Sequence, residues 1–282
     1  MAEEPTEFWG EFAIDPVEIA LPRGSGFTLR AYRSLSAFAP TDVSERPEDE
    51  DPFARRPDVP LEDDDEEELP EVDEEELTRQ ALGVAADEDE DRKTDTSIDL
   101  EPIADEAEEE QDAEEVEEAD VEEVPLFLTH KGRLLLFKST EGLVEFVKSG
   151  APNDLAQLPE WEQLVADINV DEVQPADDDT YELDLVVENL RGGHDAWDPN
   201  LILSAGEVAR DIAYALRLDG VLNVLSTGSP LDNLDEALRS ATSGGVGGFL
   251  AKRRVRKIGA QQASLGWRTV IGKISGVVDW RD

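Results

Sequence analysis

Basic side chains cluster without acidic neighbours near the carboxyl end of the sequence, and their types and spacing are suited to binding polyanions. Between Ala237 and Val278 there are eight Lys or Arg residues and no Asp or Glu, in a chain whose formal net charge is -45. Clustered cations bind phosphate backbones through counterion release, and a nearby aromatic ring can stack on a base. The residues predicted to bind a polyanion are Lys252, Arg253, Arg254, Arg256, Lys257, Trp267, Arg268 and Lys273.

Two other interpretations fit the same basic block. An anionic membrane surface would also attract it, but the apolar face that a surface-bound helix needs is thin here. A solvated, charged helix face is the purely structural alternative. Because the block stands out from an otherwise acidic chain, we keep polyanion binding as a hypothesis, with DNA or RNA as the candidate partner.

A long acidic segment, residues 41–124, carries the opposite charge. It holds 40 of the 70 acidic residues and only 6 of the 25 basic ones. Low hydrophobicity combined with high like charge predicts intrinsic disorder, because too little apolar area is available to offset the entropy of ordering. A polyanion and a polycation on one chain have a high effective concentration for each other. We therefore hypothesise that the acidic linker autoinhibits the basic segment by competing with nucleic acid.

Few residues suit catalysis or metal binding, and the chain has no Cys and only two His. His194, Asp195 and Asp198 are metal-ligand types, but adjacent acids in a Gly-containing loop are typical of a capped turn. Asp177–Asp179 offers oxygen ligands without the spacing of a calcium-binding loop. The glycines of 244–248 are not followed by the Gly-Lys-Ser/Thr of a phosphate-binding loop. The sequence predicts no catalytic residue, no metal and no cofactor, and hence a protein that is not an enzyme.

The elements that must position these residues begin with a β-hairpin. Apolar and polar residues alternate over 17–21 and again over 27–32, with the turn-forming residues 22–26 between them. Period-two alternation around a Gly-containing turn predicts two antiparallel strands. An isolated hairpin is marginally stable in water. Residues 1–40 are therefore expected to dock on the domain beyond the acidic segment, and so are the aromatic residues of Phe8–Phe12.

A second set of elements is predicted from Pro125 onward. Residues 126–130 and 133–138 flank Lys131-Gly132 and predict a second hairpin, and alternation over 181–187 predicts a further strand. Helices are predicted after Ser139 or Thr140, over residues 158–168, from the capping box Ser204–Glu207 to Gly220, and from Ser229-Pro230 onward.

Together these elements predict an α+β fold. Its antiparallel sheet would come from the two hairpins and the further strand, packed with helices and interrupted by the long disordered acidic segment. The expected divisions are a docking hairpin segment at 1–40, the acidic linker at 41–124, the α+β domain at 125–242, and a Gly hinge with a basic tail at 243–282. Closure entropy permits so long an insertion, because its cost grows only logarithmically with length. Two independently folded ends are the alternative.

Three stretches resemble one known group of proteins. Phe8-Trp9-Gly10-Glu11-Phe12, residues 15–33 and residues 127–137 are together similar to an uncharacterised family of acidic actinobacterial proteins, some members of which are loosely labelled primosomal protein. The shared residues are structural, so the resemblance implies no catalytic or binding residue. It slightly favours the nucleic-acid interpretation.

The sequence thus predicts a non-enzymatic interaction or regulatory protein, with a polyanionic tether, a basic docking tail and an unknown protein partner. The alternative is an accessory nucleic-acid-binding protein that works through the basic carboxyl-terminal segment. The first residues lack the pattern of a signal peptide, and no apolar run reaches the length of a membrane span. A cytoplasmic location is therefore expected.

Overall fold

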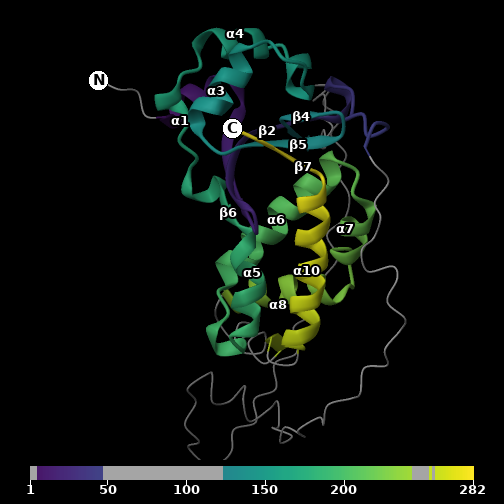
Figure 1. The fold of residues 1–282 in the computed structure, drawn as a ribbon. Helices are drawn as coiled ribbons and strands as arrows, with labels where there is room; N and C mark the ends of the chain where they lie inside the picture. The colour runs from purple at the N-terminus through teal and green to yellow at the C-terminus, as the bar shows by residue number, and fades with distance from the viewer. Residues whose placement is uncertain (1–4, 47–122, 243–253, 256–257) are drawn as a thin grey trace, which may run out of the picture. The chain divides into compact units, whose positions relative to one another are not determined.

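A mixed β-sheet lies at the centre of the computed structural model, which describes residues 5–46, 123–242, 254–255 and 258–282 (Figure 1). Most of the acidic segment and the glycine hinge predicted from the sequence lie outside these residues. The described elements belong to one compact unit. Helices and strands share this unit, so the predicted α+β class is confirmed.

The first hairpin consists of β1 (Ile14–Leu21) and β2 (Gly24–Ser34), paired antiparallel with Leu21 opposite Gly24. Two residues, Pro22 and Arg23, form the turn. Farther along β2, a Cβ at Gly26 would lie 2.9 Å from side-chain atoms of Leu136 and Trp280. Gly26 therefore lets the strand approach its neighbours more closely than any other residue would.

The second hairpin lies beyond the acidic segment in sequence but joins the same sheet. It comprises β3 (Glu123–Phe127), β4 (Thr129–His130) and β5 (Arg133–Phe137), with Lys131 and Gly132 at positive φ in the turn. Strand β2 pairs antiparallel with β3 and meets β5 at Phe27 and Phe137. The amino-terminal hairpin is thus part of the sheet rather than a separate folded end.

Two further strands make the sheet mixed rather than antiparallel, which corrects the sequence prediction. β6 (Thr180–Glu182) runs parallel to β1, and β7 (Val278–Arg281) runs parallel to β5. Parallel strands need long crossover connections, and helices separate both of these strands from their partners in sequence. The main path of the seven-stranded sheet is β4-β5-β2-β1-β6, with β3 on β2 and β7 on β5.

Both faces of this sheet are buried. Leu134 and Leu136 of β5 point into one hydrophobic cluster, whereas Leu135 and Phe137 point into another. Because successive side chains of a strand alternate between faces, a run of four apolar residues fits a strand that is covered on both sides. Figure 1 shows the two sets of covering helices, one above the sheet and one below it.

The upper face is covered by α1 (Pro5–Phe12), α3 (Thr140–Lys148) and α4 (Trp161–Asp167). The predicted cap of α3 is confirmed, because the Ser139 hydroxyl accepts a hydrogen bond from Gly142 N. Trp9 and Phe12 are buried, and Trp9 Nε1 donates to the carbonyl of Glu172 at 2.7 Å. The aromatic residues near the amino end therefore dock on the domain, as expected.

The lower face is covered by α5 (Leu183–Arg191), α6 (Pro199–Ala215), α8 (Pro230–Thr242) and α10 (Ala260–Gly276), together with the short α7 (Asp219–Val224). Short 3-10 turns link the elements at η1 (Leu35–Ala37), η2 (Asp154–Gln157), η3 (Val170–Glu172), η4 (Asp177–Asp179) and η5 (His194–Ala196). Within the described residues, no helix has the length and apolar character needed to cross a membrane.

The strand predicted over 181–187 is wrong for most of its length, because the chain turns helical at Leu183. The buried residues of α5 are Leu183, Val186 and Leu190, which follow helical spacing. By contrast Leu185, one of the apolar residues whose alternation predicted the strand, is 46% exposed. Over this short window the apolar residues fit either period, and packing into the hydrophobic cluster below the sheet, which we call the lower core, selects the helix.

The start of α6 also differs from its prediction. The side chain of Asp198 caps the helix by accepting from Asn200 N and Leu201 N, and Pro199 occupies the first turn. Ser204, the predicted cap, lies inside the helix. The Ser-x-x-Glu pattern is thus a coincidence within a longer helix, whose true start has its own Asp-Pro signal.

The described part of the predicted basic tail is not a tail. Helix α10 packs against α5, α7 and α8, and β7 completes one edge of the sheet. Its residues Trp267, Val270 and Ile274 belong to the lower core. Residues 260–281 are therefore an integral part of the fold.

Replacing Trp267 by Ala should lower the free energy of unfolding by about 3–5 kcal/mol, because it leaves a large cavity in the lower core. Urea denaturation of the full chain would measure the loss. Leu265→Ala is the matched control, since Leu265 lies on the same helix but is 47% exposed. A similar small loss for both variants would contradict the packing described for α10.

Candidate functional site

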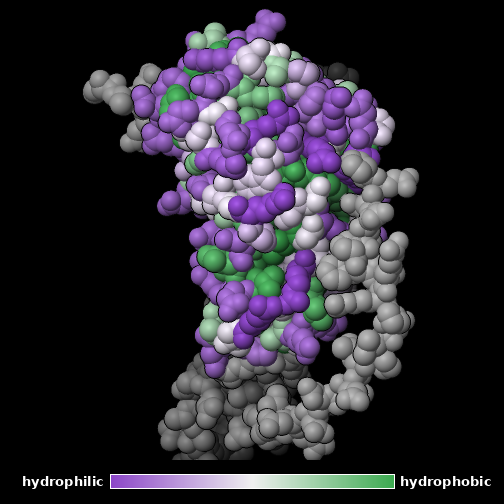
Figure 2. All heavy atoms as spheres, in the orientation of Figure 1, coloured by the Kyte–Doolittle hydropathy of each residue, from purple (hydrophilic) through white to green (hydrophobic). Residues whose placement is uncertain are grey.

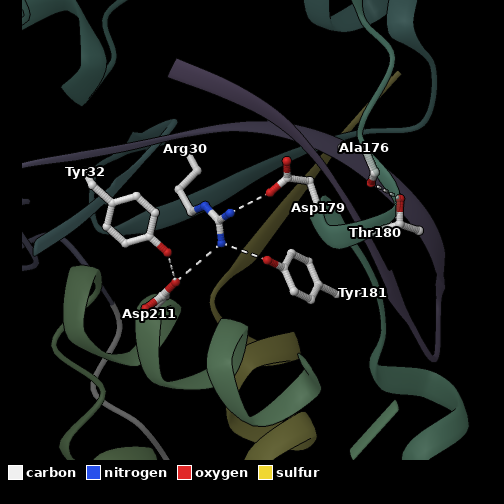
Figure 3. Close-up of polar contacts among 7 residues, drawn as sticks. All are labelled: Arg30, Tyr32, Ala176, Asp179, Thr180, Tyr181 and Asp211. Carbon is white, nitrogen blue, oxygen red and sulfur yellow. Dashed lines mark hydrogen bonds and ion pairs between the residues drawn. The ribbon is translucent and has the colours of Figure 1, made fainter. Parts of the chain in front are cut away.

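A buried arginine joins the sheet to the lower helices (Figure 3). Arg30 of β2 is 7% exposed, and its guanidinium donates to Asp179 Oδ1 at 2.6 Å and to the Tyr181 hydroxyl at 2.9 Å. A longer contact of 3.4 Å reaches Asp211 Oδ2. These partners belong to η4, β6 and α6, so one side chain ties three separate elements to the central strand.

Aromatic rings enclose the same guanidinium. Its central carbon lies 5.1 Å from the ring centroid of Tyr32 and 5.6 Å from that of Tyr181. The Tyr32 hydroxyl in turn donates to Asp211 Oδ2 at 2.5 Å. We call Arg30, Tyr32, Asp179, Tyr181 and Asp211 the Arg30 cluster. Its members come from distant parts of the sequence, and their contacts join the sheet to helix α6 below it.

Burial shifts the protonation equilibria of the carboxyl groups near Arg30. It raises the pKa of Asp211, although the hydrogen bond from Tyr32 and the charge of Arg30 oppose the rise. Burial also raises the pKa of Asp179 and of Asp15, again against the attraction of Arg30. Asp15 lies directly opposite Arg30 across the β1–β2 pair. One guanidinium therefore faces more carboxyl groups than it can neutralise.

An open polar hollow of about 450 Å3 borders the Arg30 cluster. Its lining residues are all polar or charged and come from β2, α6 and α8: Tyr32, Glu207, Arg210, Asp211, Asp232, Asp235 and Arg239. Ion pairs cross it, because Asp235 contacts both Arg210 and Arg239, and Arg239 also contacts Glu207. The hollow brings solvent to one side of Asp211.

A second depression, which we call the apolar groove, has a different character. It has a volume of about 370 Å3. Its lining comes from η1 and the residues that follow it, from β3, and from the end of α6 with α7. Its lining residues are Leu35, Phe38, Pro40, Thr41, Pro125, Leu126, Tyr214, Ala215, Arg217, Asp219 and Leu222. Large apolar side chains thus line a groove that is open to solvent.

Two groove residues are unusually exposed for their type. Leu35 is 51% exposed and Tyr214 is 43% exposed, and they line the groove from two different elements, η1 and α6. The other two exposed large apolar residues of the described chain, Leu185 and Leu265, lie on α5 and α10. Figure 2 shows apolar surface between polar side chains over that helical part of the molecule. The apolar groove differs because its exposed residues line a concave surface.

The residues predicted to bind a polyanion are only partly brought together. Lys252, Arg253, Arg256 and Lys257 lie outside the described residues. Arg254 and Arg268 are exposed, whereas Lys273 is half-buried, with its Nζ 2.9 Å from the position that a Cβ on Gly220 would take. Trp267 is 2% exposed in the lower core. Its ring is therefore not available for stacking on a base, which corrects its assignment.

Three of the other candidate ligands from the sequence have structural roles. Asp198 caps α6, and His194 Nε2 lies 2.8 Å from the carbonyl oxygen of Ile258. Asp179 pairs with Arg30. Among the residues that the structure describes, no group of three or more His, Asp or Glu side chains is placed to hold a metal ion.

Sequence reasoning missed both the Arg30 cluster and the apolar groove. A weak signal existed for the cluster, since Thr28, Arg30 and Tyr32 alternate with the apolar Phe27, Leu29 and Ala31 and so place a cation beside an aromatic residue on one face of β2. The groove left no local signal, because its walls are far apart in the sequence.

Comparison with known proteins identifies the family. The sequence model of the SatS C-terminal domain family matches residues 119–275, more than half of the chain. The chain belongs to this family. No curated protein matches the sequence significantly.

A solved structure shares the fold of this family member. It is the crystal structure of a SatS C-terminal domain in complex with bromine, which aligns with a TM-score of 0.52 and 16% sequence identity. The alignment covers 97% of each chain. At this identity the likeness shows the fold alone.

Replacing Arg30 by Met should lower the free energy of unfolding by about 3–5 kcal/mol, because it leaves buried carboxyl groups without their counterion. Thermal and urea denaturation would measure the loss. Lys138→Met is the control: its ion pair with Asp282 is largely exposed, so the expected loss is about 1 kcal/mol or less. Equal effects of the two substitutions would show that Arg30 does not hold the layers together.

Proposed function

We propose that this protein is a non-enzymatic interaction protein that binds an apolar segment of a partner protein in the apolar groove. The observation that carries the proposal is the exposure of Leu35 and Tyr214, which come from two different elements and line one concave surface. Large apolar side chains that line a concave, solvent-exposed surface are typical of binding sites.

The composition of the groove favours polypeptide as the ligand. Its walls combine aliphatic, aromatic and proline side chains, with only Thr41, Arg217 and Asp219 as polar lining residues. Tyrosine is enriched at the centres of protein interfaces, because it offers a large contact area with a polar tip. A segment that places two or three apolar side chains in the groove would cover the exposed faces of Leu35 and Tyr214.

The walls of the groove are held by the fold in advance of binding. The wall that carries Leu35 continues from β2, and the wall that carries Tyr214 is the last turn of α6. The hydrogen bond between Tyr32 and Asp211 joins β2 to α6, three residues before Leu35 on one side and three residues before Tyr214 on the other. Arg46 also joins the chain after η1 to the end of α6, because its guanidinium donates to the carbonyl of Leu216. A preformed site loses less conformational entropy when it binds.

Charge indicates which segments should bind best. Residues 47–122 are strongly acidic in sequence, and the whole chain has a net charge of -45. Such a field attracts basic partners and repels acidic ones. The favoured ligand is therefore an apolar segment flanked by Lys or Arg.

Fluorescein-labelled peptides of 15 residues would test this proposal by anisotropy. One peptide has an apolar centre with Lys flanks, the second has the same centre with Glu flanks, and the third has a polar centre with Lys flanks. We expect the first to bind most tightly. Leu35→Glu should weaken its binding by at least about ten-fold, equivalent to about 1.4 kcal/mol, because it places a charge in the groove.

Leu185→Glu is the matched control, because Leu185 is nearly as exposed as Leu35 but lies on α5. It should leave the affinity unchanged. Equal binding by wild type and the Leu35→Glu variant would overturn the groove as the binding site. Equal binding of the two Lys-flanked peptides would indicate attraction by charge alone.

Nucleic-acid binding is a second candidate, supported by the absence of acidic residues from α10. Within the described residues, Arg254, Arg268 and Lys273 have no ion-pair partner. If these cations bind DNA or RNA, affinity should fall steeply between 50 and 200 mM salt, and Arg268→Gln should weaken it. Comparing the full chain with a variant lacking residues 47–122 would test competition by the acidic segment. Salt-independent or undetectable binding would remove this candidate.

A further inference from the structure

Strand β7 forms an edge of the sheet (Figure 1). Its residues Val278–Arg281 pair in parallel with β5 on one side, and none of the described strands pairs with its other side. An edge strand leaves a row of backbone N–H and C=O groups available to another strand. Addition of a strand at such an edge is a common way for proteins to bind polypeptide.

The hydrogen bonds to β5 determine which backbone groups of β7 face outward. Leu134 N donates to the carbonyl of Val277 at 3.0 Å, and Lys138 N donates to the carbonyl of Arg281 at 3.0 Å. The N–H and C=O of one residue point to the same side of a strand, and those of the next residue point to the other side. The backbone N–H and C=O of Trp280 therefore face away from β5.

The charged side chains of β7 are complementary to those of a second β7 strand. Asp279 and Arg281 lie on one face of the strand, where Arg281 Nη2 donates to Asp279 Oδ2 at 2.6 Å. Their side chains are 35% and 41% exposed, so this pair is open to solvent. In an antiparallel pairing with Trp280 opposite Trp280, each Asp279 faces Arg281 of the second copy. The two Trp280 residues then exchange both of their backbone hydrogen bonds.

The neighbouring registers of this pairing are unfavourable. A slip by two residues in one direction places Asp279 opposite Asp279, and a slip in the other direction places Arg281 opposite Arg281. Like charges directly opposite each other destabilise a strand pair, whereas opposite charges stabilise it. A slip by one residue misaligns the outward backbone groups. The charges of this short strand therefore specify one register for pairing with itself.

We propose that two copies of this protein associate through β7, in an antiparallel pairing centred on Trp280 that continues the sheet from one copy into the other. Such a contact uses the same surface on both copies and closes at two. The inference goes beyond the proposed function, because β7 contributes no residue to the apolar groove. The dimer has two apolar grooves, one from each copy.

The fold holds β7 in place before any association. The Trp280 side chain packs against the lower core, and its ring lies 2.9 Å from the position that a Cβ on Gly26 would take. A strand that is already ordered loses less conformational entropy when it pairs. The net charge of -45 on each copy opposes association. Salt screens this repulsion at long range, whereas the facing side chains of β7 act at short range.

Sedimentation velocity of the full chain would test the proposal. The measurement is made at about 150 mM salt, where the Debye length is about 8 Å. The contact is small, so we expect a dissociation constant of about 10 to 300 µM, which protein concentrations from about 5 to 500 µM cover. The expected result is a reversible equilibrium between monomer and dimer. A monomer at every concentration would overturn the proposal, and so would association that continues beyond two copies.

Exchange of the two charges tests the pairing itself. Asp279→Arg places like charges opposite each other at two symmetric positions, so it should weaken the dimer by at least about ten-fold, and Arg281→Asp should do the same. The double variant restores both pairs of opposite charge, and its affinity should return to within about three-fold of wild type. A folded double variant, checked by urea denaturation, that remains as weak as the single variants would contradict the proposed register.

Glu162→Arg is the matched control for Asp279→Arg. It changes the net charge by the same amount, but Glu162 is exposed on α4 rather than on β7. The control should leave the dissociation constant unchanged. If it weakens the dimer as much as Asp279→Arg does, the association depends on net charge and not on β7.

Amide hydrogen exchange provides a second test that needs no variant. The outward amide of Trp280 should gain protection of about three-fold or more as the protein concentration rises from about 5 to 500 µM, because the dimer covers it. The amide of Arg281 faces β5 in the monomer and should change less. A Trp280 amide whose exchange does not depend on concentration would rule out this pairing, even if sedimentation detects a dimer.

Discussion

The buried charge of Arg30 is the constraint on which the arrangement of the layers depends. A guanidinium removed from water must find acceptors, because an unpaired buried charge is strongly destabilising. Arg30 finds them in η4, β6 and α6. Movement of any of these elements away from β2 would therefore remove an acceptor from the buried guanidinium. Hydrophobic burial drives the helices onto the sheet, and this cluster specifies where they come to rest.

The same cluster relates the two surface features of the fold. Tyr32 and Asp211 line the polar hollow, while η1, which follows β2, and the last residues of α6 line the apolar groove. The Tyr32–Asp211 hydrogen bond thus joins the two elements that lead into the groove. Membership of the SatS C-terminal domain family identifies the fold, whereas the proposed binding surface follows from the side chains of this chain.

Much of the local structure could be predicted from the sequence because it is encoded by neighbouring residues. Alternation and turn residues identified both hairpins, and Ser139 and Ser229-Pro230 marked helix starts. Prediction failed where the tertiary context decides. The residues around Leu183 suit either a strand or a helix, and the lower core selects the helix. Trp267, predicted to be a binding residue, is buried because α10 packs into the lower core. The Arg30 cluster and the groove join residues too distant in sequence for any local pattern to connect them.

The chain leaves the sheet before the acidic segment and returns to it afterwards, and the two ends of this insertion lie close together. Thr41 Oγ1 lies 3.3 Å from Thr129 Oγ1, so the described chain on the two sides of the acidic segment is fastened together inside the fold. When both ends of an insertion are fixed in this way, doubling its length costs only about 0.6 kcal/mol. The sheet therefore places little restriction on how many residues lie between 46 and 123. Relatives with the same fold are free to differ widely in the length and composition of this insertion while keeping every strand pairing described above.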